Sequence, residues 1–189
     1  LLIERQIIKF TFISVLTGIV RTTVVFWLPT YISQYLGFSS ETSAMLFTVA
    51  TLVISFTTFV TVFVYEKLNR NMDLTILLAF ILSAASFLLV YLIKIPAINI
   101  ALMVVAIMSS NGAATMLWSR YCPSLKDTGK VSSATGFLDF MSYMAAAASS
   151  TIFANAVTSI GWKNLIFVWF VLAVCGIIVA LPKKVFKKA

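Results

Sequence analysis

The sequence contains no histidine, only two cysteines and only six acidic residues among 189. Zinc sites and Cys-His nucleophiles need side chains that this composition does not supply. Two thiols, Cys122 and Cys175, cannot form the framework of a disulfide-stabilised protein. No paired carboxylates and no set of nucleophile and base are evident either. These absences argue against an enzyme, a metal centre and a bound cofactor.

Charged residues are also scarce, at 11%, whereas 61% of the residues are apolar and the mean hydropathy is +1.03. Soluble proteins average about 45–50% apolar residues, and a chain this short cannot bury so large an excess. The composition therefore predicts an integral membrane protein. The formal net charge of +8 does not indicate nucleic-acid binding, because the basic residues lie between apolar runs rather than on one solvated face.

The apolar runs predict an all-α protein of six transmembrane helices. A bilayer core about 30 Å thick needs roughly 20 helical residues per crossing, so six crossings and short connections account for the whole chain. The predicted helices are Ile8–Leu36, Thr42–Tyr65, Leu74–Ile93, Ala97–Tyr121, Val131–Thr158 and Asn164–Leu181. Turn-forming residues separate them, among them Gly37, Asn69, Asn71, Pro96 and Gly161.

The basic residues between the helices are distributed unequally. One side of the predicted membrane carries Arg5, Lys9, Lys67, Arg70, Arg120, Lys126, Lys130, Lys183, Lys184, Lys187 and Lys188. The other side carries only Lys94 and Lys163. The positive-inside rule therefore predicts a plasma (inner) membrane protein with both termini in the cytoplasm. Residues 183–189 are expected to form a basic cytoplasmic tail that touches anionic lipid.

Arg21 lies about midway along the first predicted helix. A central Arg costs roughly 2.5 to 3.5 kcal/mol on insertion scales, so it normally faces a bundle interior or an aqueous cavity. One interpretation is an ion pair that fixes two helices together. The other is a fixed cation for an anionic substrate, since a guanidinium matches carboxylate or phosphate oxygens in bidentate fashion. Pro29, about two turns further, is expected to bend this helix, as helices that gate often bend.

Asp139 is the only acidic residue inside a predicted helix. At helical spacing it shares a polar, small-residue stripe with Thr135, Ser142, Tyr143 and Ser150. Such a stripe permits close helix packing. Asp139 is therefore interpreted either as a structural hydrogen-bond or ion-pair partner, or as the carrier of a coupling proton.

The middle of the fourth helix is unusually polar, with the run Ser109-Ser110-Asn111-Gly112-Ala113-Ala114-Thr115. Asn111, Thr115 and Trp118 fall on one helical face. This face is predicted to line a cavity, in which Asn111 hydrogen-bonds a ligand and Thr115 narrows the passage. The alternative is that Asn111 joins two helices.

Six helices with cytoplasmic ends resemble the C-terminal half of a major facilitator superfamily transporter. Arg21, Trp27, Pro29, Thr30 and Tyr31, which read Arg-x5-Trp-x-Pro-Thr-Tyr, resemble the seventh helix of the organophosphate:phosphate antiporter family. That family includes glycerol-3-phosphate and hexose-phosphate transporters, and its matching arginine binds the phosphate group. The run 133–137 together with Tyr143 is similar to the eleventh helix of the family.

This resemblance implies two inverted three-helix repeats, residues 1–93 and 97–182, within one bundle spanning residues 1–189. The first, second, fourth and fifth helices would face a central cavity. A second six-helix half would complete it, either the N-terminal half of the same protein or a homodimer partner. The chain begins with Leu rather than Met, which suggests part of a longer or processed protein.

The function that the resemblance implies is secondary active transport of a small organic anion. A phosphate ester would exchange for inorganic phosphate by alternating access, with Arg21 binding the anionic group and Asn111, Thr115 and Tyr143 completing the site. Asp139 and Pro29 are the candidates for coupling and gating. Two alternatives remain: a proton-coupled symporter of a carboxylate or neutral solute that uses Asp139, and a non-transporting ligand receptor with the same fold.

Overall fold

The computed structural model describes residues 6–182, in which helices account for nearly all of the chain. Six helical segments are long and apolar enough to cross a membrane: Ile7–Gln34, Ser40–Lys67, Met72–Leu92, Pro96–Ser124, Val131–Ser159 and Gly161–Ala180. The prediction of an all-α chain with six helices of membrane-spanning length and hydropathy is confirmed for the described residues, and no boundary differs from the predicted one by more than three residues. These helices indicate a multi-pass membrane protein. The predicted basic tail, residues 183–189, lies outside the described residues.

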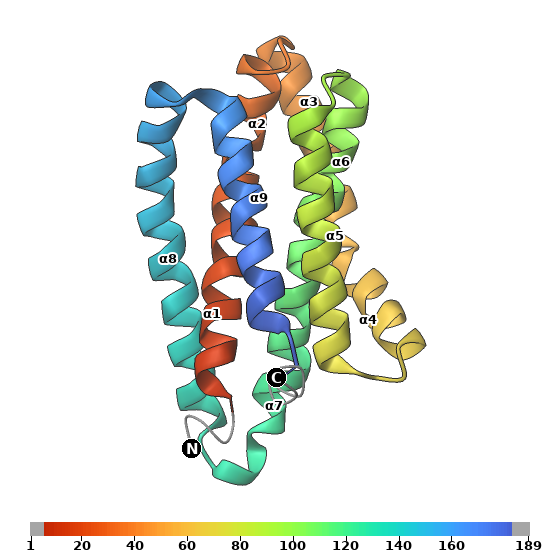
Figure 1. Ribbon diagram of the computed structural model, residues 1–189, viewed down its shortest axis with the longest axis vertical. Coiled ribbons are helices and arrows are strands. Elements are labelled where there is room, and N and C mark those ends of the chain that lie inside the picture. The colour runs from red at the N-terminus through yellow and green to blue at the C-terminus, as the bar shows by residue number, and fades with distance from the viewer. Residues whose placement is uncertain (1–5, 183–189) are drawn as a thin grey trace, which may run out of the picture.

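The helices run side by side along the long axis of the molecule (Figure 1). The first span consists of α1 (Ile7–Gly18), a π-helical segment η1 (Ile19–Val24) and α2 (Val25–Gln34). The second span is divided into α3 (Ser40–Ser55) and α4 (Thr57–Lys67). The later spans are α5 (Met72–Leu92), α6 (Pro96–Met116) followed by the π-helical η2 (Leu117–Tyr121) and α7 (Cys122–Ser124), α8 (Val131–Ser159) and α9 (Gly161–Ala180).

The two ends of the bundle differ in charge. The start of α1, the connection from α4 to α5, the short helix α7 and the end of α9 all lie at one end (Figure 1). Among the described basic residues, this end carries Lys9, Lys67, Arg70, Arg120, Lys126 and Lys130, whereas the other end carries Lys94 and Lys163. The predicted separation of basic residues is therefore present in the fold.

Three of the helices begin at capping residues or at a proline. The side chain of Ser39 accepts a hydrogen bond from the Thr42 amide at 3.2 Å, which caps α3. Asn71 caps α5 in the same way through the Leu74 amide at 3.0 Å, and Pro96 occupies the first turn of α6, where its missing amide costs nothing.

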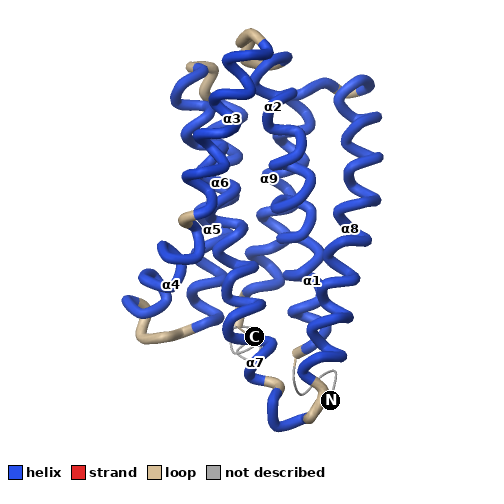
Figure 2. The backbone as a smooth tube through the Cα atoms, turned by 180° about the vertical axis from the view of Figure 1, so that it is seen from behind, coloured by secondary structure: helices blue, strands red, loops and turns tan. Residues whose placement is uncertain are grey.

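The second span is broken at Phe56, a feature that the predicted helix Thr42–Tyr65 does not contain. Ser55 donates its hydroxyl to the Leu52 carbonyl at 2.6 Å, and Thr57 donates to the Ile54 carbonyl. These hydroxyls bond to carbonyl groups one turn back, and such bonding competes with the backbone hydrogen bonds of the helix. As a result, α4 departs from the direction of α3 and stands apart from α5 (Figures 1 and 2).

The second and fifth spans are the least buried of the six. Both views place α8 along one edge of the bundle and α4 along the opposite edge (Figures 1 and 2). The interior is filled mainly by large apolar side chains of the other spans, including the fully buried Phe80, Phe87, Ile107 and Trp169.

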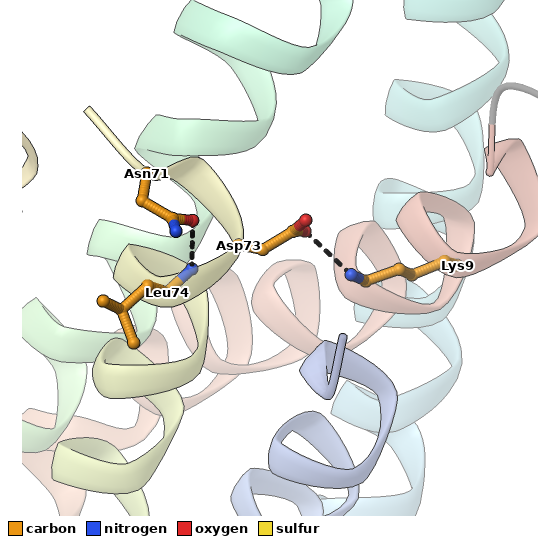
Figure 3. A network of polar contacts seen from close by, with 4 residues as sticks. All are labelled: Lys9, Asn71, Asp73 and Leu74. Atoms are coloured by element: carbon orange, nitrogen blue, oxygen red, sulfur yellow. Dashed lines mark hydrogen bonds and ion pairs between the residues drawn. The ribbon is translucent and has the colours of Figure 1, made fainter. Parts of the chain in front are cut away.

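Polar contacts fix the first span near both of its ends. Lys9 Nζ lies 2.8 Å from Asp73 Oδ1 of α5 (Figure 3). Towards the other end, the Tyr31 hydroxyl donates to the buried amide of Asn99, whose nitrogen donates to the Val90 and Ile93 carbonyls at 3.0 and 2.9 Å. The first span is thus tied to the hairpin formed by α5 and α6.

Candidate solute-binding site

Arg21 lies inside the π-helical segment η1 and is half-buried. Its guanidinium carbon lies 5.8 Å from the centre of the Tyr143 ring on α8. Among residues 6–182, no carboxylate comes within ion-pair distance of it. The fixed charge therefore rests on an aromatic face, an arrangement worth about 0.5–1 kcal/mol at exposed sites. No described residue supports the interpretation of Arg21 as half of an ion pair.

The first span and α8 approach each other very closely. Ser14 donates its hydroxyl to the Leu138 carbonyl at 2.7 Å. One turn further, a Cβ atom built on Gly18 would lie only 2.2 Å from Ser142 Oγ, so only glycine fits here. Beyond Arg21, Thr23 and Ser149 share a hydrogen bond of 3.2 Å across the same interface. This line of contacts fixes where Arg21 meets α8.

The π-helical segment keeps these contacts in register. Three contacts join the two segments: Ser14 with Leu138, Gly18 with Ser142, and Thr23 with Ala146. Successive contact residues on α8 are four positions apart. On the first span, the interval from Ser14 to Gly18 is also four, but the interval from Gly18 to Thr23 is five. An α-helix would bring residue 22 to the interface instead. The additional residue in the wider turn places Thr23 against α8 and leaves Thr22 exposed beside Arg21.

A cleft of about 280 Å³ lies beside this interface. It is lined by residues from the first span and from α8, namely Thr22, Thr23, Phe26, Tyr143, Ala146, Ala147 and Ser150. The hydroxyl groups of Thr22, Tyr143 and Ser150 have no hydrogen-bond partner within the described chain. They are therefore free to donate to a ligand in the cleft.

The cleft combines polar and apolar walls. Arg21 is not itself a lining residue, but its guanidinium lies over the ring of Tyr143, which is one. A guanidinium close to hydroxyl groups suits the oxygens of a small anion, while Phe26 and the two alanines offer surface to an organic group. Phe26 is 68% exposed and Tyr143 is 55% exposed. The described chain therefore leaves one side of the cleft open.

Asp139 lies on α8 one helical turn before Tyr143. It is half-buried, and neither a hydrogen bond nor an ion pair joins it to the described residues. It does not line the cleft. Pro29 lies inside α2, five residues after the end of η1, and is also half-buried.

The polar segment of the fourth span does not contribute to this cleft. Thr115 donates its hydroxyl to the Asn111 carbonyl of its own helix at 3.0 Å. The side-chain oxygen of Asn111 is buried and has no hydrogen-bond partner in the described part of the chain. The neighbouring Gly112 faces α4, since its Cβ would lie 2.9 Å from Thr61 Oγ1. The structure therefore brings Arg21 and Tyr143 together and leaves Asn111 and Thr115 elsewhere.

Three residues of the cleft, Thr22, Thr23 and Phe26, are not among those that the sequence reasoning identifies. Two adjacent threonines directly after Arg21 are a sequence feature from which a polar site next to the arginine could have been predicted. Ser150 had been placed on the polar stripe of the fifth helix, but not at the site. Comparisons of this chain with protein-family models, with curated proteins and with solved structures found no match.

Proposed function

We propose that this chain is part of a secondary active transporter that carries a small organic anion across the membrane. The preferred substrate is a phosphate ester exchanged for inorganic phosphate, and Arg21 binds its anionic group during alternating access. This function is proposed for a multi-pass protein in which the described bundle is one of two cooperating six-helix halves.

The observation that carries the proposal is that Arg21 has no carboxylate partner among the described residues. Its guanidinium lies over Tyr143 beside the cleft, and no described carboxylate neutralises it. A positive charge within a membrane-spanning segment is costly unless a partner or water compensates it. An anionic solute in the cleft supplies that compensation, with Thr22 and Ser150 as hydrogen-bond donors on either side.

Two features support a second half and the arrangement in inverted repeats. The cleft is open on the side where Phe26 and Tyr143 are exposed, so another body is needed to enclose a solute. The spans that would begin the two repeats, the first and the fourth, each contain a π-helical segment. These features fit the C-terminal half of a major facilitator transporter as expected from the sequence.

A second candidate function is proton-coupled symport. It is favoured by Asp139, which is half-buried, lacks a partner among the described residues and lies one turn from Tyr143. A carboxylate in that position can gain and lose a proton during transport. The solute would then be a carboxylate or a neutral molecule.

The proposal is tested by phosphate exchange in vesicles. The protein, purified with any subunit that remains bound to it, is reconstituted into phosphate-loaded liposomes, and entry of radiolabelled phosphate and competition by phosphate esters are measured. Arg21→Lys should reduce exchange at least tenfold, because a single ammonium cannot form the bidentate contact. Arg70→Lys, at an exposed position beside Glu66, serves as the matched control.

Exchange that persists unchanged in Arg21→Lys removes Arg21 from the site and overturns the proposal. Binding of phosphate without any movement across the membrane identifies a receptor with a transporter-like fold. Uptake that requires a proton gradient rather than internal phosphate favours the symport alternative.

A further inference from the structure

A second cavity lies between α4, α5 and α6, and Arg21 is not among its lining residues. It is on the flank of the molecule where α4 stands apart from α5 (Figure 1). It has a volume of about 290 Å³ and is formed by α4, α5 and α6. Its walls include Val60, Thr61, Ala79, Leu82, Val105 and Gly112. Val60 is 51% exposed and Leu82 is 52% exposed, so the cavity opens on the outer surface of the bundle as a crevice.

The crevice offers no hydrogen bonds from its threonines. Thr61 donates its hydroxyl to the Thr57 carbonyl at 2.8 Å, and Thr75 donates to the Asn71 carbonyl at 2.8 Å. Thr57 donates to Ile54 in the same manner. Because each of these hydroxyls is already paired with the backbone of its own helix, the threonines present mainly methyl groups to the crevice. Among the lining hydroxyls only that of Ser109 lacks a partner within the described residues, so a hydrated or charged solute would lose most of its hydration there without compensation.

Gly112 forms the back of the crevice. A Cβ atom at this position would lie 2.9 Å from Thr61 Oγ1, and it would approach the side chain of Ala79 at 3.9 Å. Small residues on α5 and α6 therefore create the space that α4 leaves uncovered. Its volume of about 290 Å³ is too small for a further helix, which measures about 10–12 Å across with its side chains, and leaves a hydrocarbon chain as the better occupant.

Basic side chains lie at the end of the crevice where the second span finishes. The Arg120 guanidinium carbon is 4.8 Å from the ring centre of Tyr65, the residue after the crevice residue Val64. Lys67 Nζ is 5.6 Å from the ring centre of Phe63. Within the described chain neither cation has a carboxylate partner. This is also the bundle end that carries most of the described basic residues, the predicted cytoplasmic end.

We propose that this crevice binds an anionic phospholipid of the cytoplasmic leaflet. One acyl chain lies between α4 and α5 against Gly112, and the phosphate of the headgroup lies beside Arg120 and Lys67. The apolar walls select hydrocarbon, and the two cations select a negatively charged headgroup over a zwitterionic one. An attraction of about 1 kcal/mol per basic residue corresponds to a preference of roughly fivefold for each.

The test uses native mass spectrometry of the purified protein, after removal of lipid and addition of either phosphatidylglycerol or phosphatidylcholine. The unmodified protein should hold one phosphatidylglycerol molecule, at an affinity at least fivefold above that for phosphatidylcholine. Ala79→Phe fills the crevice and should reduce binding of both lipids at least tenfold. Ala85→Phe, at an exposed position of the same helix outside the crevice, is the matched control.

Arg120→Gln separates headgroup recognition from chain binding. It should reduce the preference for phosphatidylglycerol about fivefold, because Lys67 remains, and leave phosphatidylcholine binding unchanged. Val60→Trp provides a second filling variant at an exposed position, with Val53→Trp as its control, in case Ala79→Phe does not fold. Equal lipid binding by the filled variants and their controls overturns the proposal. The proposal is also overturned if a Val60→Cys variant cross-links to a second protein subunit in native membranes. Neither outcome alters the assignment of Arg21.

Discussion

The guanidinium of Arg21 lies 5.8 Å from the centre of the Tyr143 ring, across the interface between the first span and α8. The two residues belong to segments more than one hundred positions apart in sequence. Arg21 has no carboxylate partner within the described residues, and Tyr143, the residue it contacts, lines the cleft. The aromatic ring thus contacts the guanidinium without neutralising its charge.

Substitution of Tyr143 separates the contributions of its ring and its hydroxyl. Tyr143→Phe keeps the ring beneath Arg21 and removes one hydrogen-bond donor, so anion affinity should fall by a few fold. Tyr143→Leu also frees the guanidinium, and affinity should fall by a further two- to fivefold. Competition by phosphate esters in the exchange assay measures both effects. Phe140→Leu, at another exposed aromatic on α8, should leave affinity unchanged, and equal affinities in all three variants would contradict the assigned role.

Asp139→Asn distinguishes exchange from proton coupling. If internal phosphate drives transport, the carboxylate carries no proton, and exchange should remain within about twofold of the unmodified rate. The measurement is phosphate entry with and without an imposed pH gradient. The symport alternative would be supported if Asp139→Asn abolished the phosphate entry that a pH gradient drives. The control variant Asp127→Asn should retain that entry.

Gly18→Ala should weaken the packing of α8 against α1. The added methyl group would meet Ser142 Oγ at 2.2 Å and the Ser142 carbonyl oxygen at 2.8 Å, which forces the two helices apart. We expect a loss of about 1–3 kcal/mol in the free energy of unfolding, seen as a lower midpoint in thermal unfolding.

Gly136→Ala is the control for this experiment, because a Cβ atom there meets nothing within 4 Å. It should stabilise α8 by about 0.5–1 kcal/mol through helix propensity. Adding Ser142→Gly to the Gly18→Ala variant should restore only part of the loss, since the backbone oxygen remains. Equal stability of the two single alanine variants would show that the close approach is absent.

Removing one partner of the Lys9–Asp73 pair should destabilise the bundle. The Lys9 side chain is only 11% exposed and Asp73 is 39% exposed, at a separation of 2.8 Å. Lys9→Met or Asp73→Asn is expected to cost about 1 kcal/mol in thermal unfolding. Glu66→Gln, which removes the exposed pair with Arg70, should cost much less.

The exchanged pair Lys9→Asp with Asp73→Lys should recover only part of this stability. Asp73 lies in the first turn of α5, where the helix dipole favours a negative side chain and disfavours a positive one. Complete recovery would mean that the helix terminus contributes nothing at this position.

Much of the fold was predictable because hydropathy is a property of each segment by itself. The length of an apolar run determines whether it can cross a bilayer, and turn residues such as Gly37 and Pro96 mark its ends. The break at Phe56 was not predictable in this way. It depends on whether the hydroxyls of Ser55 and Thr57 turn back to the helix or outwards, and the sequence leaves both options open.

Some residues of the candidate site could be identified from the sequence. Arg21 was identified because a charge within an apolar run is costly wherever the run packs, and Tyr143 was identified from the resemblance and from its polar stripe. The cleft itself depends on the contact between Gly18 and Ser142 and on the five-residue interval created by η1. Both are pairwise features of two distant segments, which periodicity within a single helix does not encode.

The three successive contacts from Ser14, Gly18 and Thr23 to α8 join the two walls of the cleft over more than two helical turns. A tilt of α8 that widened the space beside Tyr143 would break a hydrogen bond or drive the backbones together at Gly18. The separation of these walls is consequently constant within one rigid unit. In the proposed transporter, admission and release of a solute would then depend on the body that approaches the uncovered side, so substitutions in that body, rather than in the walls, should alter the rate of entry.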